Sequence, residues 1–291
     1  MQAQAYKYAL IAVFCWSTVA TAFKIALDYL SPTELVLYSS IVSTLILFTI
    51  VIYQKKLSDV KIHIKSNFKL VFILGCINPF LYYLILFKAY DLLPAQEAQS
   101  INYTWALMLA FLSVIFLKQK LTINDILAGI LCYFGVLIIA TKGEPFSLSF
   151  SNLDGVFFAL LSTIIWAMYW IINTKIKVDP IVGLSSNFVI ALPIVVVYFL
   201  LTQPLIIPDI KGLLAASYVG LFEMGITFLF WLKAMQIATS TSKIANLIFI
   251  SPFISLIFIY FLVGEKILVS TVIGLTKIII GLIIQQLKTS K

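Results

Sequence analysis

Ten apolar runs follow one another along this chain, and each is long enough to cross a lipid bilayer as a helix. The runs cover residues 8–27, 35–53, 70–90, 95–117, 126–141, 153–173, 181–201, 213–235, 239–263 and 269–287. Charged residues make up only 11% of the chain and hydrophobic residues 62%. A soluble domain could not bury so much apolar surface. The pattern predicts an all-α polytopic membrane protein with ten transmembrane helices and short loops.

The basic residues are 20 lysines without any arginine, against 12 acidic residues, so the net charge is +8. These lysines lie mostly between the apolar runs instead of on a basic soluble surface, so no nucleic-acid partner is expected. When the loops are assigned to alternate sides, most lysines, including those of the loop 54–69, fall on the side of both chain ends. By the positive-inside rule, we expect a multi-pass protein of the bacterial inner (plasma) membrane with both termini cytoplasmic.

Residues that could support an enzyme are sparse. Cys15, Cys76 and Cys132 lie inside apolar runs, and His63, which is the one histidine, lies in a lysine-rich loop. Neither a Cys-x-x-Cys pair nor a metal-ligand spacing is present, so we expect no metal and no cofactor. The loops are too short to hold a catalytic domain. We therefore predict a protein that is not an enzyme.

The chain contains an internal repeat. Gly75 and the Lys88-Ala89 pair that follows it align, 145 residues later, with Gly220 and the Lys233-Ala234 pair. Further on, after one residue of drift, Gly135 aligns with Gly281. The alignment predicts two five-helix repeats, residues 1–145 and 146–291. Because five is an odd number, the second repeat would enter the membrane with inverted orientation, which is typical of alternating-access carriers.

Several short segments of the chain resemble the EamA branch of the drug/metabolite transporter superfamily. They are Trp16-Ser17-Thr18, the two Lys-Ala pairs, Ser251-Pro252, Gly264-Glu265-Lys266 and Gly274. The resemblance implies a carrier of five plus five helices, often an exporter of amino acids and other metabolites. It also implies a central cavity formed by the first, third, fourth, sixth, eighth and ninth spans.

The segment Asn102-Tyr103-Thr104-Trp105 is also similar to the Asn-Tyr-x-Trp segment of aromatic amino acid exporters in this superfamily. Two positions depart from that pattern. Ala106 stands where the exporters have proline, and Gln119 stands where a glutamate is expected in the first repeat.

Aromatic and polar residues within the spans are candidates for the substrate cavity. Aromatic faces and hydroxyl tips suit amphiphilic organic molecules and amino acids, although each such residue can equally serve helix packing. The candidates are Trp16, Ser17, Thr18, Tyr82, Tyr83, Asn102, Tyr103, Trp105, Trp166 and Trp231.

Charged residues inside the apolar runs are candidates for coupling or gating, because a charge near the bilayer centre costs about 3 kcal/mol. Glu223, whose repeat counterpart is the neutral Asn78, could exchange a proton as the cavity alternates, or it could form a structural ion pair with Lys277. Lys24 and Glu97 lie toward the outer ends of their spans. They could extend to the interface, form an outer gate or bind the two ends of a zwitterion. The full set is Glu223, Lys24, Glu97, Lys243 and Lys277.

These features predict a secondary active transporter that exports small organic metabolites, such as amino acids, by alternating access. Its partners would be a small-molecule substrate, the lipid bilayer and, if transport is coupled, protons. Two alternatives stay open. One is an uptake carrier or exchanger for a nucleoside-like metabolite, and the other is a structural or lipid-handling membrane protein that does not transport.

Overall fold

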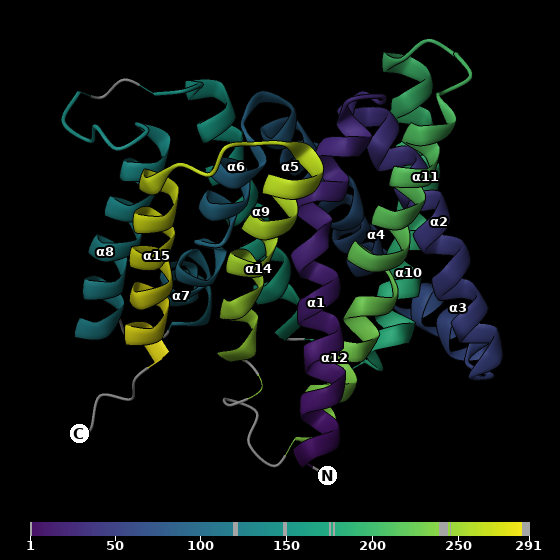
Figure 1. Ribbon diagram of the computed structural model, residues 1–291. Coiled ribbons are helices and arrows are strands. Elements are labelled where there is room, and N and C mark those ends of the chain that lie inside the picture. Colours follow the sequence, from purple (N-terminus) through teal and green to yellow (C-terminus); the bar gives the residue numbers. More distant parts are fainter. Residues whose placement is uncertain are drawn as a thin grey trace. The chain divides into compact units, whose positions relative to one another are not determined.

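The computed structural model describes residues 2–118, 122–147, 150–174, 176, 178–238, 244 and 246–286 of the 291 residues. The regular structure of these parts is helical (Figure 1). Eight helical segments are long and apolar enough to cross a membrane, and two shorter apolar segments cover Leu247–Val263 and Val269–Gln285. The prediction of an all-α protein with several membrane-spanning helices is confirmed.

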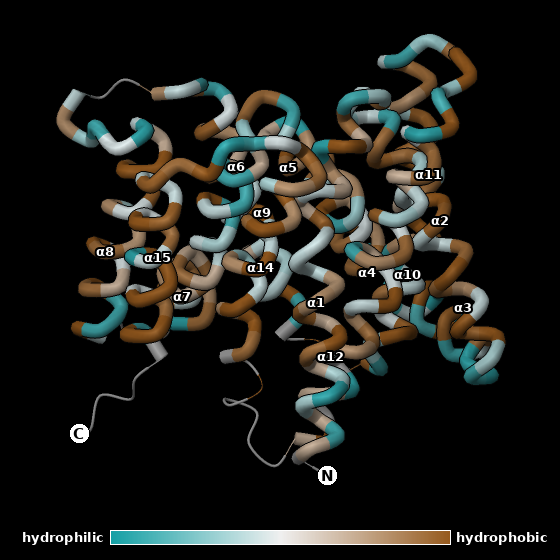
Figure 2. The backbone as a smooth tube through the Cα atoms, viewed as in Figure 1, coloured by the Kyte–Doolittle hydropathy of each residue, from teal (hydrophilic) through white to brown (hydrophobic). Residues whose placement is uncertain are grey.

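The membrane-length segments are built from both continuous and interrupted helices. In chain order the elements are α1 (Gln2–Leu27), α2 (Pro32–Tyr53), α3 (Leu57–Ser66), α4 (Phe68–Gly75), η1 (Cys76–Leu81), α5 (Tyr82–Leu92), α6 (Ala95–Asn102), α7 (Trp105–Leu117), α8 (Ile123–Ala140), α9 (Leu153–Thr174), α10 (Pro180–Thr202), α11 (Ile210–Tyr218), η2 (Val219–Glu223), α12 (Ile226–Ile237), η3 (Asn246–Ile250), α14 (Ser251–Phe258), η4 (Ile259–Val263) and α15 (Val269–Gln286). The long helices are mostly brown in Figure 2, whereas hydrophilic residues concentrate at their ends and connections.

The helices pack into two compact units, each formed from two separate pieces of the chain. The first unit comprises Met1–Phe87 and Lys177–Val263, and the second comprises Lys88–Ile176 and Gly264–Lys291. In the first unit α1 packs against α11, α12 and α14, while α2 packs against α10. In the second unit α8 packs along α15, and α9 packs against α6 and α7 (Figure 1).

Local signals set the start of two helices. The hydroxyl of Ser31 accepts a hydrogen bond from the backbone N–H of Glu34, and the Glu34 carboxylate accepts one from the Ser31 N–H. Thr122 and Asp125 make the same reciprocal pair at the start of α8. Each such capping box satisfies backbone donors that the helix itself leaves without a partner.

The prolines inside the spans have different effects. A proline inside a membrane span can kink or break the helix. Pro79 lies in the π-helical segment η1, which is interrupted at Asn78, where φ is −141° and ψ is 116°. Pro252 lies in the first turn of α14, where its missing N–H costs little. Pro193 lies inside α10, which continues through it, so a break there is not observed.

A second interruption lies in the span from Ile210 to Met235. The π-helical segment η2 ends at Glu223, and Gly225 then adopts φ −116° and ψ −102° before α12 begins. These two interruptions lie at Asn78 and directly after Glu223.

Glycines bring backbones into direct contact within each unit. A Cβ added to Gly75 would lie 2.8 Å from the carbonyl oxygen of Asn187 in α10, and one added to Gly220 would overlap the carbonyl oxygen of Ser39 in α2. Small residues of this kind let membrane helices approach closely.

The pair of α8 and α15 is packed in the same way. A Cβ on Gly135 would lie 2.6 Å from the carbonyl oxygen of Gly274, and one on Gly281 would lie 3.1 Å from that of Ala128. These contacts leave no room for a larger side chain along the shared seam.

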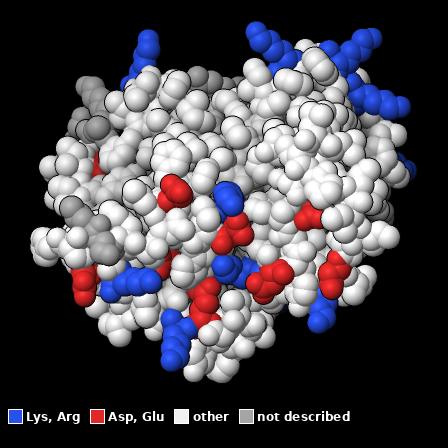
Figure 3. Space-filling model, turned by 90° about the horizontal axis from the view of Figure 1, so that it is seen from above, with Lys and Arg blue, Asp and Glu red and all other residues white. Residues whose placement is uncertain are grey.

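The lysine-rich loop that the sequence places between the second and third spans contains a helix, α3. His63 lies on it and is half-buried, and this loss of hydration lowers the pKa of its imidazole. Its ring is therefore neutral at pH 7. On the face shown in Figure 3, acidic groups and lysines are interspersed on an otherwise uncharged surface.

Candidate transport site

Glu223 lies at the interruption of its span, as the last residue of η2, and its side chain is partly exposed. The Tyr83 hydroxyl donates a hydrogen bond of 3.2 Å to Glu223 Oε1. Tyr83 is itself 1% exposed and packs at 4.8 Å against the ring of Tyr82 and at 5.5 Å against Phe87. The carboxyl group is therefore held by a phenol that a buried aromatic cluster fixes in place.

Hydroxyl groups connect α1 to two neighbouring helices of the first unit. The oxygens of Thr18 and Tyr218 lie 2.6 Å apart, which joins α1 to α11. Ser17 Oγ lies 3.1 Å from Ser251 Oγ of α14, and both serines are 0% exposed. A buried hydroxyl without a hydrogen-bond partner would lower the free energy of unfolding by about 1–3 kcal/mol. These pairs therefore favour the packing of α1 against α11 and α14.

Trp16 supplies an aromatic surface on α1. Its ring centroid lies 5.5 Å from that of Phe228, nearly perpendicular to it, and 5.5 Å from that of Trp231. Trp16 and Trp231 are both partly exposed. The first unit thus combines aromatic faces, hydroxyls and the Glu223 carboxyl, and it includes six of the cavity candidates: Trp16, Ser17, Thr18, Tyr82, Tyr83 and Trp231.

The remaining candidates for the cavity lie in the second unit. Asn102 Nδ2 donates a hydrogen bond of 2.9 Å to Ser162 Oγ. Trp105 stacks on Trp170 at 6.4 Å, and Trp166 meets the same Trp170 ring edge-on at 5.9 Å. The structure therefore brings Trp105 and Trp166 against the same indole ring.

Tyr103 and Trp166 differ in their surroundings. Trp166 is 7% exposed and stacks on Tyr169 at 5.3 Å, so it contributes to the interior of the second unit. Tyr103, at the end of α6, is partly exposed. Of these two positions, only Tyr103 combines an aromatic ring with an accessible surface.

Glu97 is buried in the second unit. It is 1% exposed, and Ser151 donates a hydrogen bond to its Oε2. Its burial argues against a position at the lipid interface. The charges of Lys142 and Glu265 act on it as well.

The Gly264-Glu265-Lys266 segment fixes the start of α6. Glu265 Oε1 accepts a hydrogen bond of 2.7 Å from the Ala95 N–H, and the Gln96 N–H donates to Oε2 at 3.3 Å. Gln96 also donates to the Lys266 carbonyl and accepts from Leu268 N and Thr271 Oγ1. A carboxylate at a helix N-terminus satisfies free N–H groups and complements the helix dipole. The loop before α15 is therefore tied to α6.

The lysines inside the spans have separate environments. Lys24 lies in the last turn of α1 and is partly buried. Lys277 Nζ lies 5.5 Å from the centre of the Phe134 ring, which is a cation–π distance. Lys243 lies outside the described residues, so its predicted role stays a prediction.

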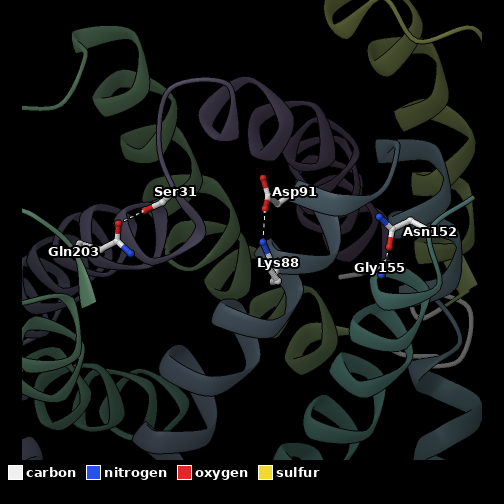
Figure 4. A network of polar contacts seen from close by, with 6 residues as sticks. All are labelled: Ser31, Lys88, Asp91, Asn152, Gly155 and Gln203. Carbon is white, nitrogen blue, oxygen red and sulfur yellow. Dashed lines mark hydrogen bonds and ion pairs between the residues drawn. The ribbon is translucent and has the colours of Figure 1, made fainter. Parts of the chain in front are cut away.

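Figure 4 shows three further polar contacts that organise helix ends. Lys88 pairs with Asp91 at 2.7 Å within α5. Ser31 donates to Gln203 at 3.2 Å, and Asn152 accepts from the Gly155 N–H at 2.9 Å.

The candidate set left out several partners that the structure reveals, among them Tyr218, Trp170, Ser162 and Ser151. Trp170 could have been found, because it lies four residues after Trp166 and so on the same helix face. The other three lie far in sequence from the residues they contact. Across the described parts of the chain, no group of three or more His, Cys, Asp or Glu side chains converges as metal ligands would.

Comparisons with known proteins agree with this picture. The family model described as EamA-like transporter family matches residues 4–141 and 153–285. An uncharacterized transporter from Archaeoglobus fulgidus is 23% identical over 280 residues, which cover 94% of this chain and 95% of the relative. The uncharacterized transporter YyaM of Bacillus subtilis is 25% identical over 270 residues, which cover 89% and 86% of the two chains.

A solved crystal structure also aligns with this chain. The TM-score is 0.70 over 98% of this chain and 97% of the other, at 17% identity. At this identity the match establishes a shared fold.

Proposed function

Because the chain belongs to the EamA-like transporter family, we propose that it exports small organic metabolites, amino acids in particular, across a bacterial inner membrane by proton-coupled alternating access. The observation that carries this proposal is the Glu223 carboxyl group, which lies at a helix interruption and is held by the Tyr83 hydroxyl. Ionisable groups at broken membrane helices are common at transport sites.

The aligned irregularities support an architecture of two inverted repeats, residues 1–145 and 146–291. The interrupted segments that contain Asn78 and Glu223 correspond in the repeat alignment. Gly75 and Gly220 are 145 residues apart, and each closely approaches a backbone carbonyl of another helix. Gly135 and Gly281 are 146 residues apart and both lie on the seam between α8 and α15. Equivalent contacts at a nearly constant offset are expected from two copies of one fold.

The mechanism follows from the chemistry of a single carboxyl group. When the site faces the cytoplasm, Glu223 releases its proton, and the negative carboxylate can attract the ammonium group of an amino acid. When the site faces the outside, proton binding neutralises Glu223 and weakens that attraction, so the substrate leaves. The aromatic surface around Trp16 would contact the apolar part of the substrate. The carrier would thus exchange one proton for one substrate.

The test is radiolabelled amino acid flux in proteoliposomes that contain the purified protein. We expect the parent protein to accumulate substrate when a pH gradient is imposed. Glu223→Gln resembles the permanently protonated form, so it should bind the substrate more weakly. It should keep exchange at high substrate concentration but reduce pH-driven accumulation at least tenfold. The matched control is Glu144→Gln, which removes an exposed loop carboxylate and should leave both activities unchanged.

Two outcomes would overturn parts of this proposal. Full pH-driven accumulation by Glu223→Gln would mean that coupling resides elsewhere. If the parent protein moves nucleosides but no amino acid, the substrate class is wrong, and the alternative of a nucleoside carrier gains support.

A further inference from the structure

A pocket of about 450 Å³ lies within the first unit, at the ends of α1, α10 and α12. It is lined in part by Tyr8, Lys56, Asp179, Phe230 and Lys233. Its volume is in the range typical of small-molecule sites. Glu223 and its partner Tyr83 are not among the lining residues, so this pocket is distinct from the candidate transport site.

One charge of the pocket has no internal counterion. Lys56 Nζ pairs with Asp179 Oδ2 at 2.7 Å, and Asp179 Oδ1 accepts a hydrogen bond from the Ile181 N–H. Both oxygens of the single lining carboxylate are therefore engaged. Within the described parts of the chain, no carboxylate lies within 4.0 Å of the exposed Lys233. The lining therefore carries a net charge of one positive unit.

The repeat makes this unpaired charge more informative. Lys88, the counterpart of Lys233, has a partner three residues later, because Asp91 lies 2.7 Å away on the same helix. The residue three positions after Lys233 is Gln236, which is neutral. In the first repeat, an ion pair on the same helix therefore neutralises the lysine at this position. In the second repeat, the sequence provides no acidic residue three positions after Lys233.

The wall beside Lys233 is apolar and aromatic. The rings of Tyr8 and Phe230 stack with their centroids 6.2 Å apart and an interplanar angle of 22°. Tyr8 packs against a core that includes Ala5, Ala9 and Ala234, each 0% exposed. This packed interior limits the movement of the Tyr8 ring.

We propose that this pocket binds a small organic carboxylate, with Lys233 holding the carboxylate and the rings of Tyr8 and Phe230 contacting the apolar body. The inference rests on the proposed function, because such a molecule would be cargo captured before it reaches Glu223. An acidic lipid headgroup would offer a similar anionic group. The pocket volume, the single free charge and the aromatic wall favour a compact soluble ligand.

The test measures binding of radiolabelled 3-phenylpropanoate to the full-length protein by equilibrium dialysis in nanodiscs of a zwitterionic lipid. We expect saturable binding, and about tenfold weaker binding of the neutral amide, 3-phenylpropanamide. Lys233→Gln should weaken binding of the carboxylate about tenfold without changing that of the amide, and Lys233→Arg should retain it. Phe230→Ala should weaken binding of both probes.

Lys211→Gln is the matched control, because Lys211 is another lysine of the first unit but lies over the Tyr29 ring outside the pocket. Equal binding of the carboxylate and the amide would overturn the proposal, and so would parent-like binding by Lys233→Gln. If phosphatidylglycerol in the nanodisc abolishes binding of the carboxylate, the pocket is a lipid site and the proposal fails.

The pocket proposal and the proposed function can fail independently of each other. Binding is measured without a gradient, so a parent protein that binds the probe through Lys233 but shows no flux would overturn only the proposed function. If pH-driven flux is normal but binding of the probe does not depend on Lys233, only the proposal that this pocket binds a carboxylate would be overturned.

Discussion

The contact between Thr18 and Tyr218 shows how a single hydrogen bond is directed. The Thr18 hydroxyl donates to the carbonyl oxygen of Cys15 at 2.6 Å, and it has only one proton. The Tyr218 hydroxyl, 2.6 Å away, must therefore be the donor to Thr18. The direction of this bond determines which of the two substitutions leaves a polar group without a partner.

Thr18→Val should cost more stability than Tyr218→Phe. The first change strands the Tyr218 hydroxyl and should lower the free energy of unfolding by about 1–3 kcal/mol, whereas the second removes a donor and should cost about 0.5–1.5 kcal/mol. The measurement is denaturation of the purified variants in detergent. Because the two groups form one bond, the double variant should cost less than the sum of the single variants. Strict additivity would contradict the contact.

At the scale of helices, close backbone approach at glycine decides which spans can pack together. Gly220 lies against the backbone of Ser39, where an added Cβ would meet a carbonyl group that cannot rotate away. Gly183 is different, because an added Cβ there would meet only the end of the Val178 side chain, at 2.9 Å. The two positions form a matched pair on helices of the first unit.

Gly220→Ala should separate η2 from α2 and lower the free energy of unfolding by about 1–3 kcal/mol through overpacking. It should also reduce transport, because η2 carries Glu223. Gly183→Ala should be within about 1 kcal/mol of the parent, since only one methyl group of Val178 has to shift and alanine favours the helix. Thermal unfolding and flux measured on the same preparations check both expectations. If both variants were equally stable, the close approach would not be a constraint.

At the scale of the whole molecule, the lysine distribution predicts that both termini face the cytoplasm. Green fluorescent protein fused after Lys291 should therefore fluoresce, because it folds in the cytoplasm. Alkaline phosphatase inserted after Glu144, in a loop expected outside, should be active. The control is the same enzyme inserted in the loop 54–56, which should be inactive. Active alkaline phosphatase after Lys291 would reverse the topology and the assignment of the outer ends of the spans.

The sequence predicted the helical membrane fold well because hydropathy is a property of each residue and adds along a segment. Helix α10 (Pro180–Thr202) is one example, since the apolar run 181–201 predicts it to within one residue at each end and Asp179 and Pro180 set its start. The sequence did not reveal α3, because that helix is short and polar and resembles a loop in composition. Hydropathy also does not distinguish Pro193 from Pro79, although α10 continues through Pro193 and η1 is interrupted beside Pro79.

The sequence by itself therefore determined the apolar helices, the lysine asymmetry and the repeated Lys-Ala pairs, all of which can be found without knowing which helices pack together. Only the tertiary structure decided that Tyr83 donates to Glu223, 140 residues away, and that Glu265 satisfies the N-terminus of α6 across 170 residues. Such pairs depend on which helices pack together and how each is rotated about its axis. A difference of one residue turns a side chain by about 100°, which composition does not record.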